Sequence, residues 1–265
     1  MIRRDVPALG GKPAAWMLIP QIEHAHLAGR LAEHWGAGGF APLEPMAELL
    51  WAVFHHDDGW RAWDDAPGVD PARGVPRAFT EMEIDDSLAI WSGSTEIAHA
   101  AGNLQGYVVA GHFCALARRG AAWRKADRAW PRVERFLAHY EGQMMPQWLA
   151  AWQSEDPRTN TLAIAAAGLA HLQFFDSLSL WFCCAEATTP DTVTTPSGGE
   201  LLLDPRGAGR FWVSPWPFAV EELNLEVAGR MISVGHYPSR EALAAAPAQP
   251  ALPHFQLQPA PRATP

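Results

Sequence analysis

The segment AELLWAVFHHDDGW places a histidine and an aspartate side by side, His56 and Asp57, near the end of a predicted helix. Adjacent imidazole and carboxylate groups can both ligate one divalent metal ion. Apolar residues recur at three- and four-residue steps from Met46 to Val53, and the same stripe continues onto His56 and Asp57. Both side chains are therefore expected to point inward. A buried carboxylate is costly unless it is paired, so the doublet needs either a metal ion or an ordinary hydrogen-bonded core partner.

The residues around the doublet place it in the last turn of the helix. His55 and Asp58 fall off the apolar stripe, and Gly59 stands where a left-handed helix cap is expected. A helix end of this kind can border a cavity.

Two further helical segments each contribute one inward candidate. His24 lies just before the apolar stripe that runs from Leu27 to Trp35, so it is expected to face the core, whereas His26 is expected to be mostly solvated. Asp176 lies in the middle of an apolar helix face, where an unpaired carboxylate is least expected.

These three helices together predict a mixed nitrogen and oxygen site. Its four candidate ligands are His24, His56, Asp57 and Asp176. Two neutral imidazoles and two carboxylates suit Mn, Fe, Zn or, less well, Mg, and no inward cysteine accompanies them, which argues against a thiolate site.

The order His, His-Asp, Asp on separate helices resembles the HD-domain superfamily of metal-dependent phosphohydrolases. Within it, QIEHAHLAGRLAEHWG followed by HHDDGWRAWDDAP is similar to a little-characterised bacterial family with an HDDGW signature. The resemblance runs from about Trp16 to Cys184, with a short β-rich tail. It implies an all-α core and a metal site formed by the four ligands above, and no particular substrate.

HD proteins occur with one or two metal ions, and a second ion would need further ligands. His112 belongs to the inner face of its predicted helix and is a candidate, although a core histidine fits the same pattern. On the following helix Glu141 lies closer to the apolar stripe than His139 and is preferred as a second-site ligand. His99 and His171 are expected to be structural.

The leading functional expectation is a metal-dependent hydrolase acting on a phosphate ester or nucleotide-like small molecule. A metal would activate water and neutralise charge on a phosphoryl oxygen, Asp58 would act as general acid or base, and Arg61 would hold phosphate. No lysine follows the doublet, unlike in some cyclic-dinucleotide phosphodiesterases of this superfamily.

Two alternatives to the hydrolase stay open. One is an HD-type diiron oxygenase that cleaves a small organic substrate, with His112 and Glu141 or His139 at the second iron. The other is a non-catalytic module that keeps the metal for stability or binds a nucleotide without turnover.

Composition fits an intracellular enzyme better than a binder of polyanions. The chain has 265 residues, 48% of them hydrophobic, and a formal net charge of −9, so it lacks the basic excess of nucleic-acid binders. No apolar run is long enough for a signal peptide or for a membrane span of 18 consecutive apolar residues, which predicts a cytoplasmic protein without membrane contact. A small-molecule substrate is the expected partner, and the choice between monomer and homodimer stays open. The three cysteines, Cys114, Cys183 and Cys184, are expected to be reduced core thiols.

Breaker residues divide the chain into a helical part and a β-rich part. The expected fold class is mainly α, with an HD-like helical metal-binding domain over residues 1–190 and a small β-rich appendage and flexible tail over 191–265, packed on the same core. Trp16 to Ile19 and Phe255 to Leu257 are candidate extra strands, and Ala244 to Pro253 is expected to be a linker. The loop from Ala62 to Thr80 follows the doublet, so Arg61, Trp63 and Asp64 are candidates for substrate specificity, and Trp60, Trp63 and Trp91 for a pocket wall. The six expected helices span 20–36, 42–58, 85–102, 104–120, 127–154 and 160–187.

Overall fold

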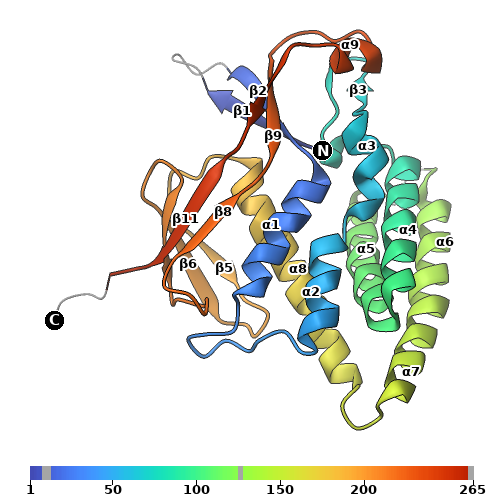
Figure 1. The fold of residues 1–265 in the computed structure, drawn as a ribbon. Helices are drawn as coiled ribbons and strands as arrows, with labels where there is room; N and C mark the ends of the chain where they lie inside the picture. The colour runs from blue at the N-terminus through green and yellow to red at the C-terminus, as the bar shows by residue number, and fades with distance from the viewer. Residues whose placement is uncertain (8–12, 125–127, 262–265) are drawn as a thin grey trace.

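The chain mixes helices and sheets. In the computed structural model, which describes residues 1–7, 13–124 and 128–261, about 50% of the chain is helical and 21% is in strands. The described residues form three multi-stranded sheets from eleven strands. The expectation of a mainly α fold with a small β appendage is therefore wrong, because strands from both ends of the chain build substantial sheets (Figure 1).

The helices fill the middle of the chain. They are α1 (Gln21–Glu33), α2 (Met46–His55), α3 (Arg61–Asp65), α4 (Ile84–Ala101), α5 (Asn103–Arg124), α6 (Trp130–His139), α7 (Met145–Glu155), α8 (Leu162–Cys184) and α9 (Arg240–Ala244). Short 3-10 turns lie at η1 (Asp58–Trp60) and η2 (Phe79–Glu81), and a π-helical segment, η3 (Tyr140–Met144), joins α6 to α7.

The six helices expected from apolar periodicity are confirmed, apart from their exact ends. The one expected from 127 to 154 is divided by η3, immediately before Pro146 in the first turn of α7. Proline has no amide hydrogen for the carbonyl one turn earlier, and a local widening of the helix accommodates that loss. The start of that expected helix, residue 127, lies outside the described residues.

The largest sheet has five strands in the order β5-β6-β7-β11-β8, with β11 parallel to β7 and antiparallel to β8. Its strands are β5 (Asp191–Thr194), β6 (Glu200–Pro205), β7 (Arg210–Ser214), β8 (Leu223–Glu226) and β11 (His254–Pro259). In β6 and β7 every second residue is buried, as in a sheet with one face on the core. That face joins the helical core, where Phe182 of α8 contacts Phe211 and Phe255.

A second sheet has the order β1-β2-β9-β10. Its strands are β1 (Ile2–Pro7), β2 (Pro13–Ile19), β9 (Gly229–Ser233) and β10 (Ala248–Ala251), and β2 pairs with β9 in antiparallel register. A small third sheet joins β3 (Val69–Asp70) to β4 (Val75–Pro76). Since β2 pairs with a strand more than 200 residues later, a boundary at residue 190 does not separate the sheets.

Two expected strands are present, and one expected linker contains a strand instead. The segments 16–19 and 255–257 do form strands, within β2 and β11. The stretch 244–253 is not a linker, because it contains β10 paired along β9. Of the expected flexible tail, residues 262–265 lie outside the described residues.

The helix α8 is long and apolar enough on composition alone to cross a membrane. Half of that apolar window is buried inside the fold, as in the core helix of many globular proteins, so it is weak evidence for a membrane span.

Replacing Phe182 by Ala tests whether the five-stranded sheet belongs to the same core. Phe182 is 2% exposed and packs on Phe211 and Phe255. The loss of a buried aromatic ring should lower the free energy of unfolding by about 3–5 kcal/mol. Urea denaturation followed by circular dichroism of the helices measures the change.

The matched control is Leu202→Ala, on the opposite and exposed face of β6. It should change stability by less than about 0.5 kcal/mol. An unaltered helical transition in Phe182→Ala would mean that the sheet and the helices unfold independently.

Candidate metal centre

Four helical segments bring five metal-competent side chains together inside the bundle. The two groups whose ligand atoms lie within 4.8 Å of one another are His24, His56 and Asp57, and His56, His112 and Asp176. All five side chains are buried, with exposed fractions from 0% for His24 and His56 to 8% for Asp176. The four ligands expected from the sequence and the additional candidate His112 therefore meet in one place.

The first imidazole, His24, is held from α8. Its Nδ1 lies 2.9 Å from the hydroxyl oxygen of Ser179, and that hydroxyl donates its single hydrogen to the carbonyl oxygen of Asp176 at 2.9 Å. The Ser179 oxygen must therefore accept from Nδ1–H of His24. The other ring nitrogen, Nε2, then faces Oδ2 of Asp57 at 2.9 Å.

The second imidazole, His56, is oriented in the same manner by the backbone. Its Nδ1–H donates to the carbonyl oxygen of Val53 at 2.8 Å, one turn earlier in α2. Its Nε2 lies 3.9 Å from Oδ2 of Asp57 and 3.4 Å from Oδ1 of Asp176, and has no hydrogen-bond partner among the described residues. Metal-binding histidines commonly donate the other ring N–H to a backbone carbonyl or a polar side chain in this way.

The charges of the cluster do not balance without a cation. If both imidazoles were neutral, their Nε2 lone pairs would face carboxylate oxygens in a buried space, which is repulsive. Burial alone would lower the pKa of His56, but the carboxylates of Asp57 and Asp176 raise it to about 9. Burial would raise the pKa of Asp57 and Asp176, yet the histidines around them hold both pKa values below the usual range. Protons or a metal ion must supply this positive charge.

The third imidazole, His112 of α5, extends the donor set. Burial lowers its pKa to about 4, so it is neutral near pH 7 with a free ring lone pair. Its Nδ1 is buried without a hydrogen-bond partner among the residues that the structure describes.

The donor set fits one ion better than two. Donors about 2.0–2.2 Å from a shared ion lie roughly 3–4 Å from each other, as the Nε2 and carboxylate oxygens here do at 2.9, 3.4 and 3.9 Å. Both groups of three contain His56. Its Nδ1–H is bonded to the Val53 carbonyl, so only the lone pair of Nε2 can bind a metal ion. Because that lone pair can bind one ion only, the two groups would share the same ion. Nitrogen and oxygen donors of this kind suit Mn, Fe or Zn.

Gly59 has a different role from the one expected. Its backbone is not in the left-handed region, so it is not a left-handed helix cap. Instead α4 crosses directly over it. The Gly59 N–H donates to Oγ of Ser94 at 3.0 Å, and a Cβ atom at this position would lie 2.4 Å from the carbonyl oxygen of Ile90. The glycine of the HDDGW segment thus lets α4 pack against the turn that follows the doublet.

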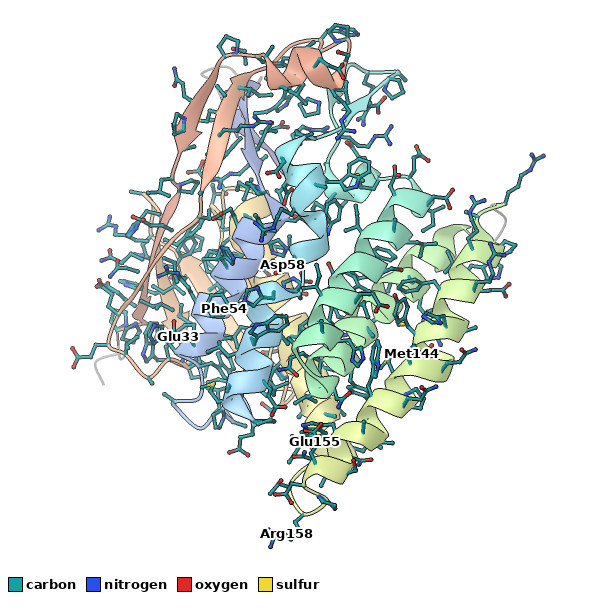
Figure 2. All side chains as sticks on the ribbon, turned by 45° about the vertical axis from the view of Figure 1, so that its right-hand side comes forward. Glu33, Phe54, Asp58, Met144, Glu155 and Arg158 are labelled. Atoms are coloured by element: carbon teal, nitrogen blue, oxygen red, sulfur yellow. The ribbon has the colours of Figure 1, made fainter. Side chains whose placement is uncertain are left out.

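The two helices that carry the first ligands also approach closely. A Cβ atom on Gly29 of α1 would lie 2.3 Å from the ring of Phe54, which is labelled in Figure 2 near the end of α2. This contact fixes α1 beside α2 and so sets His24 next to Asp57.

The expected second-site ligands do not join the cluster. Glu141 lies in η3, where it is 42% exposed and forms an ion pair with Arg118 of α5. The exposed His139 contacts the ring of Tyr140 at 4.7 Å. Apolar periodicity placed Glu141 near the inner face of a regular helix, and the π-helical turn changes that register.

The expected catalytic residues lie beside the doublet. Oδ2 of Asp58 is 2.9 Å from Nδ1 of His55, which stacks on Trp51, and Oδ1 of Asp58 is 3.6 Å from the guanidinium of Arg61. Arg61 is 61% exposed. Asp58, labelled in Figure 2, is thus tied to two neighbours and does not enter the donor set.

The aromatic and specificity candidates have packing roles. Trp60 is buried against Met82 and Ile90, with Trp63 and Trp91 at the edge of the same apolar cluster. The buried carboxylate of Asp64 accepts from the backbone N–H of Ile22 at 3.2 Å and lies 3.2 Å from the amino group of Met1.

The remaining histidines and cysteines contribute nothing to the cluster. His99 stacks on Trp148, His171 donates from Nδ1 to the carbonyl oxygen of Ala167, and His26 is half-buried beside Phe54. Cys114 and Cys183 are buried, whereas Cys184 is exposed, so the expectation of three core thiols is wrong for Cys184.

A family model described as "Protein of unknown function (DUF3891)" matches residues 9–234. The chain belongs to this family. The matched segment includes all five buried donors and Gly59. Searches of curated proteins and of solved structures found no significant match.

Replacing Gly59 by Ala should destabilise the protein. The added methyl group would collide with the backbone of α4 near Ile90 and Ser94, and overpacking of this kind costs about 1–3 kcal/mol. Chemical denaturation measures the loss. Gly142→Ala is the control, because a Cβ atom there meets no neighbour within 4 Å. Equal stability of the two variants would contradict the packing role of Gly59.

Proposed function

We propose that this protein is a metal-dependent hydrolase of the HD type that acts on a phosphate ester or a nucleotide-like small molecule. The observation that carries the proposal is the orientation of His24 and His56. Each imidazole uses Nδ1 for an outer hydrogen bond and turns Nε2 toward buried carboxylates. Their order along the chain also matches the resemblance to the HD superfamily.

The residues that would hold the ion are His24, His56, Asp57, Asp176 and His112. When bound, a divalent ion supplies Lewis-acid chemistry, activating water and neutralising charge on a phosphoryl oxygen. Ser179 and the Val53 carbonyl keep the two imidazoles in the tautomer that ligation requires. Asp176 is the most exposed of the five donors, so we infer that substrate approaches from its side.

Proton transfer is assigned to Asp58. It follows the doublet directly, its side chain is 15% exposed, and it contacts His55, which is itself partly exposed. A carboxylate linked to a surface imidazole can exchange a proton with solvent.

The phosphate contact is assigned to Arg119 rather than to Arg61, which already pairs with Asp58. Arg119 lies two helical turns beyond His112 on the same face of α5, is exposed, and has no ion pair among the described residues. Burial is the main cause of the low pKa of His112, and the positive charge of Arg119 makes a smaller contribution in the same direction. An arginine at this position can hold an anion bidentately near the metal centre.

The diiron oxygenase has less support than the hydrolase. A diiron oxygenase needs a second iron site, and Glu141 and His139 lie outside the donor cluster. A non-catalytic module would keep the same metal but turn over no substrate, so activity assays separate it from the hydrolase.

Metal content measures the first part of the proposal. Protein purified without chelators should contain about one Mn, Fe, Zn or similar ion per chain by element-resolved mass spectrometry. His56→Ala and Asp176→Asn should lose most of it while keeping their helical circular dichroism. Glu141→Ala is the matched control and should retain it. Full metal content in both His56→Ala and Asp176→Asn would refute the proposed metal site. A metal content in Glu141→Ala that is half that of the unaltered protein would show that Glu141 binds a second ion, and would refute the proposal of a single ion per chain.

Turnover of p-nitrophenyl phosphate measures the second part. Arg119→Ala should raise KM roughly tenfold or more, because a charge-assisted hydrogen bond to phosphate contributes about 1.5–3 kcal/mol. Metal content should not change.

The neighbouring Arg118→Ala removes the same charge from an arginine already paired with Glu141 and should leave KM within about twofold. Equal effects of the two variants would indicate general electrostatics rather than a phosphate contact.

A further inference from the structure

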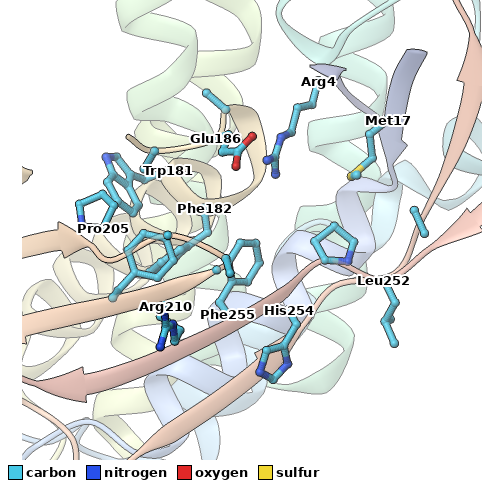
Figure 3. A pocket seen from close by; sticks show the side chains of 18 residues that line it. Arg4, Met17, Trp181, Phe182, Glu186, Pro205, Arg210, Leu252, His254 and Phe255 are labelled. Atoms are coloured by element: carbon cyan, nitrogen blue, oxygen red, sulfur yellow. The ribbon is translucent and has the colours of Figure 1, made fainter. Parts of the chain in front are cut away.

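A separate cavity of about 330 Å³ lies at the C-terminal end of α8, between that helix, β1 and the turn that joins β6 to β7 (Figure 3). Its volume is in the range of small-molecule binding sites, about 300–1,000 Å³. None of the five buried donors lines it.

One wall of the cavity is aromatic. Trp181 and Phe182 come from α8, and Phe211 and Phe255 come from the five-stranded sheet. Phe182 lies 5.2 Å from Phe211 and 5.1 Å from Phe255 between ring centroids, and these contacts fix the rings. Such a wall favours a flat apolar group.

The opposite wall carries Arg4 of β1. Arg4 is half-buried, and among the described residues its guanidinium makes no hydrogen bond, ion pair or ring contact. Its neighbour Arg3, by contrast, pairs with Glu81 at 3.0 Å. Burial raises the pKa of the Cys183 thiol and the Arg4 charge opposes that rise, so the guanidinium lies near the end of α8. Its donors are available to an anion.

Other charges around the cavity leave it net positive. Arg210 also lines it and has no ion pair among the residues that the structure describes. Glu186 extends toward Arg4 in Figure 3, but no ion pair joins the two side chains. His254 also lines the cavity, and its Nδ1 lies 3.7 Å from Oε1 of Glu226, which is not a lining residue.

The β6–β7 turn forms part of the cavity rim. Gly207, Ala208 and Gly209 all have positive φ, at 77°, 53° and 72°. Left-handed backbone is unfavourable for Ala208. Next to it, Gly209 approaches the carbonyl of His254 so closely that a Cβ atom at residue 209 would lie 2.2 Å from that oxygen.

We propose that this cavity binds a small carboxylate that carries an aromatic ring. Arg4 holds the carboxylate, Arg210 adds positive charge at the rim, and the ring packs on Trp181, Phe182, Phe211 and Phe255. The site is independent of the metal centre and of the hydrolase proposal.

Isothermal titration with 3-phenylpropionate tests the proposal. The full-length protein should bind it at millimolar concentration or below, and should bind the uncharged 3-phenylpropan-1-ol at least tenfold more weakly. Arg4→Gln should weaken binding of the carboxylate roughly tenfold. Glu186→Gln should strengthen it a few-fold, because a like charge beside the carboxylate is removed.

Three controls locate the binding. Leu252 lines the cavity from an exposed position, so Leu252→Trp should fill the cavity and abolish binding without loss of stability. Arg158 does not line the cavity and its side chain is 92% exposed, so Arg158→Gln should leave binding of 3-phenylpropionate unchanged. A chelator should have no effect, since the metal centre is not involved. The proposal is overturned by absence of binding, by equal affinity for the alcohol, by unchanged affinity in Arg4→Gln or Leu252→Trp, or by loss of binding with the chelator.

Discussion

Two carboxylates buried in the same small space form the constraint around which this molecule is arranged. Asp57 lies in the turn that follows α2 and Asp176 lies in α8, and each would be strongly destabilising if it lay alone in an apolar core. The surrounding histidines turn their Nε2 atoms toward these carboxylates, and their Nδ1 atoms are anchored by Ser179 and by the Val53 carbonyl. The helices α1, α2, α5 and α8 are arranged so that these histidines stay close to the two carboxylates and can compensate their negative charge.

Packing around the centre explains residues that carry no chemistry themselves. Gly29 and Gly59 allow α1 and α4 to approach the segment that carries the doublet, and side chains at either position would separate the helices. The five-stranded sheet covers the end of α8 through Phe182. Because α8 also carries Asp176, the position of one ligand depends on how well the sheet packs against this helix.

Much of the centre could be predicted from local sequence because helical periodicity reports which residues face inward. His24, His56, Asp57, His112 and Asp176 all lie on inward faces, as expected. Ser179 was missed, although it lies one turn after Asp176 and small polar residues on an apolar helix face commonly anchor a neighbouring side chain. The prediction of Glu141 as a second-site ligand was wrong because it assumed a regular α-helix of about 3.6 residues per turn, whereas the segment before Pro146 is π-helical. The sheets were underestimated because strand pairing is non-local. No local pattern in AAWML indicates pairing with GRMIS, and the Ala- and Pro-rich β10 has low intrinsic strand preference.

The pairing of β2 with β9 has a consequence for the order in which the protein takes shape on the ribosome. The helices from α1 to α8 are complete once residue 184 has been made, so the buried histidines and aspartates can assemble while the later strands are still unsynthesised. Until β9 and β11 emerge, the edge of β2 and the aromatic end of α8 stay uncovered. Such a nascent chain would expose an unpaired strand edge and an apolar surface together, which is the combination that chaperones recognise and that promotes aggregation when synthesis stalls.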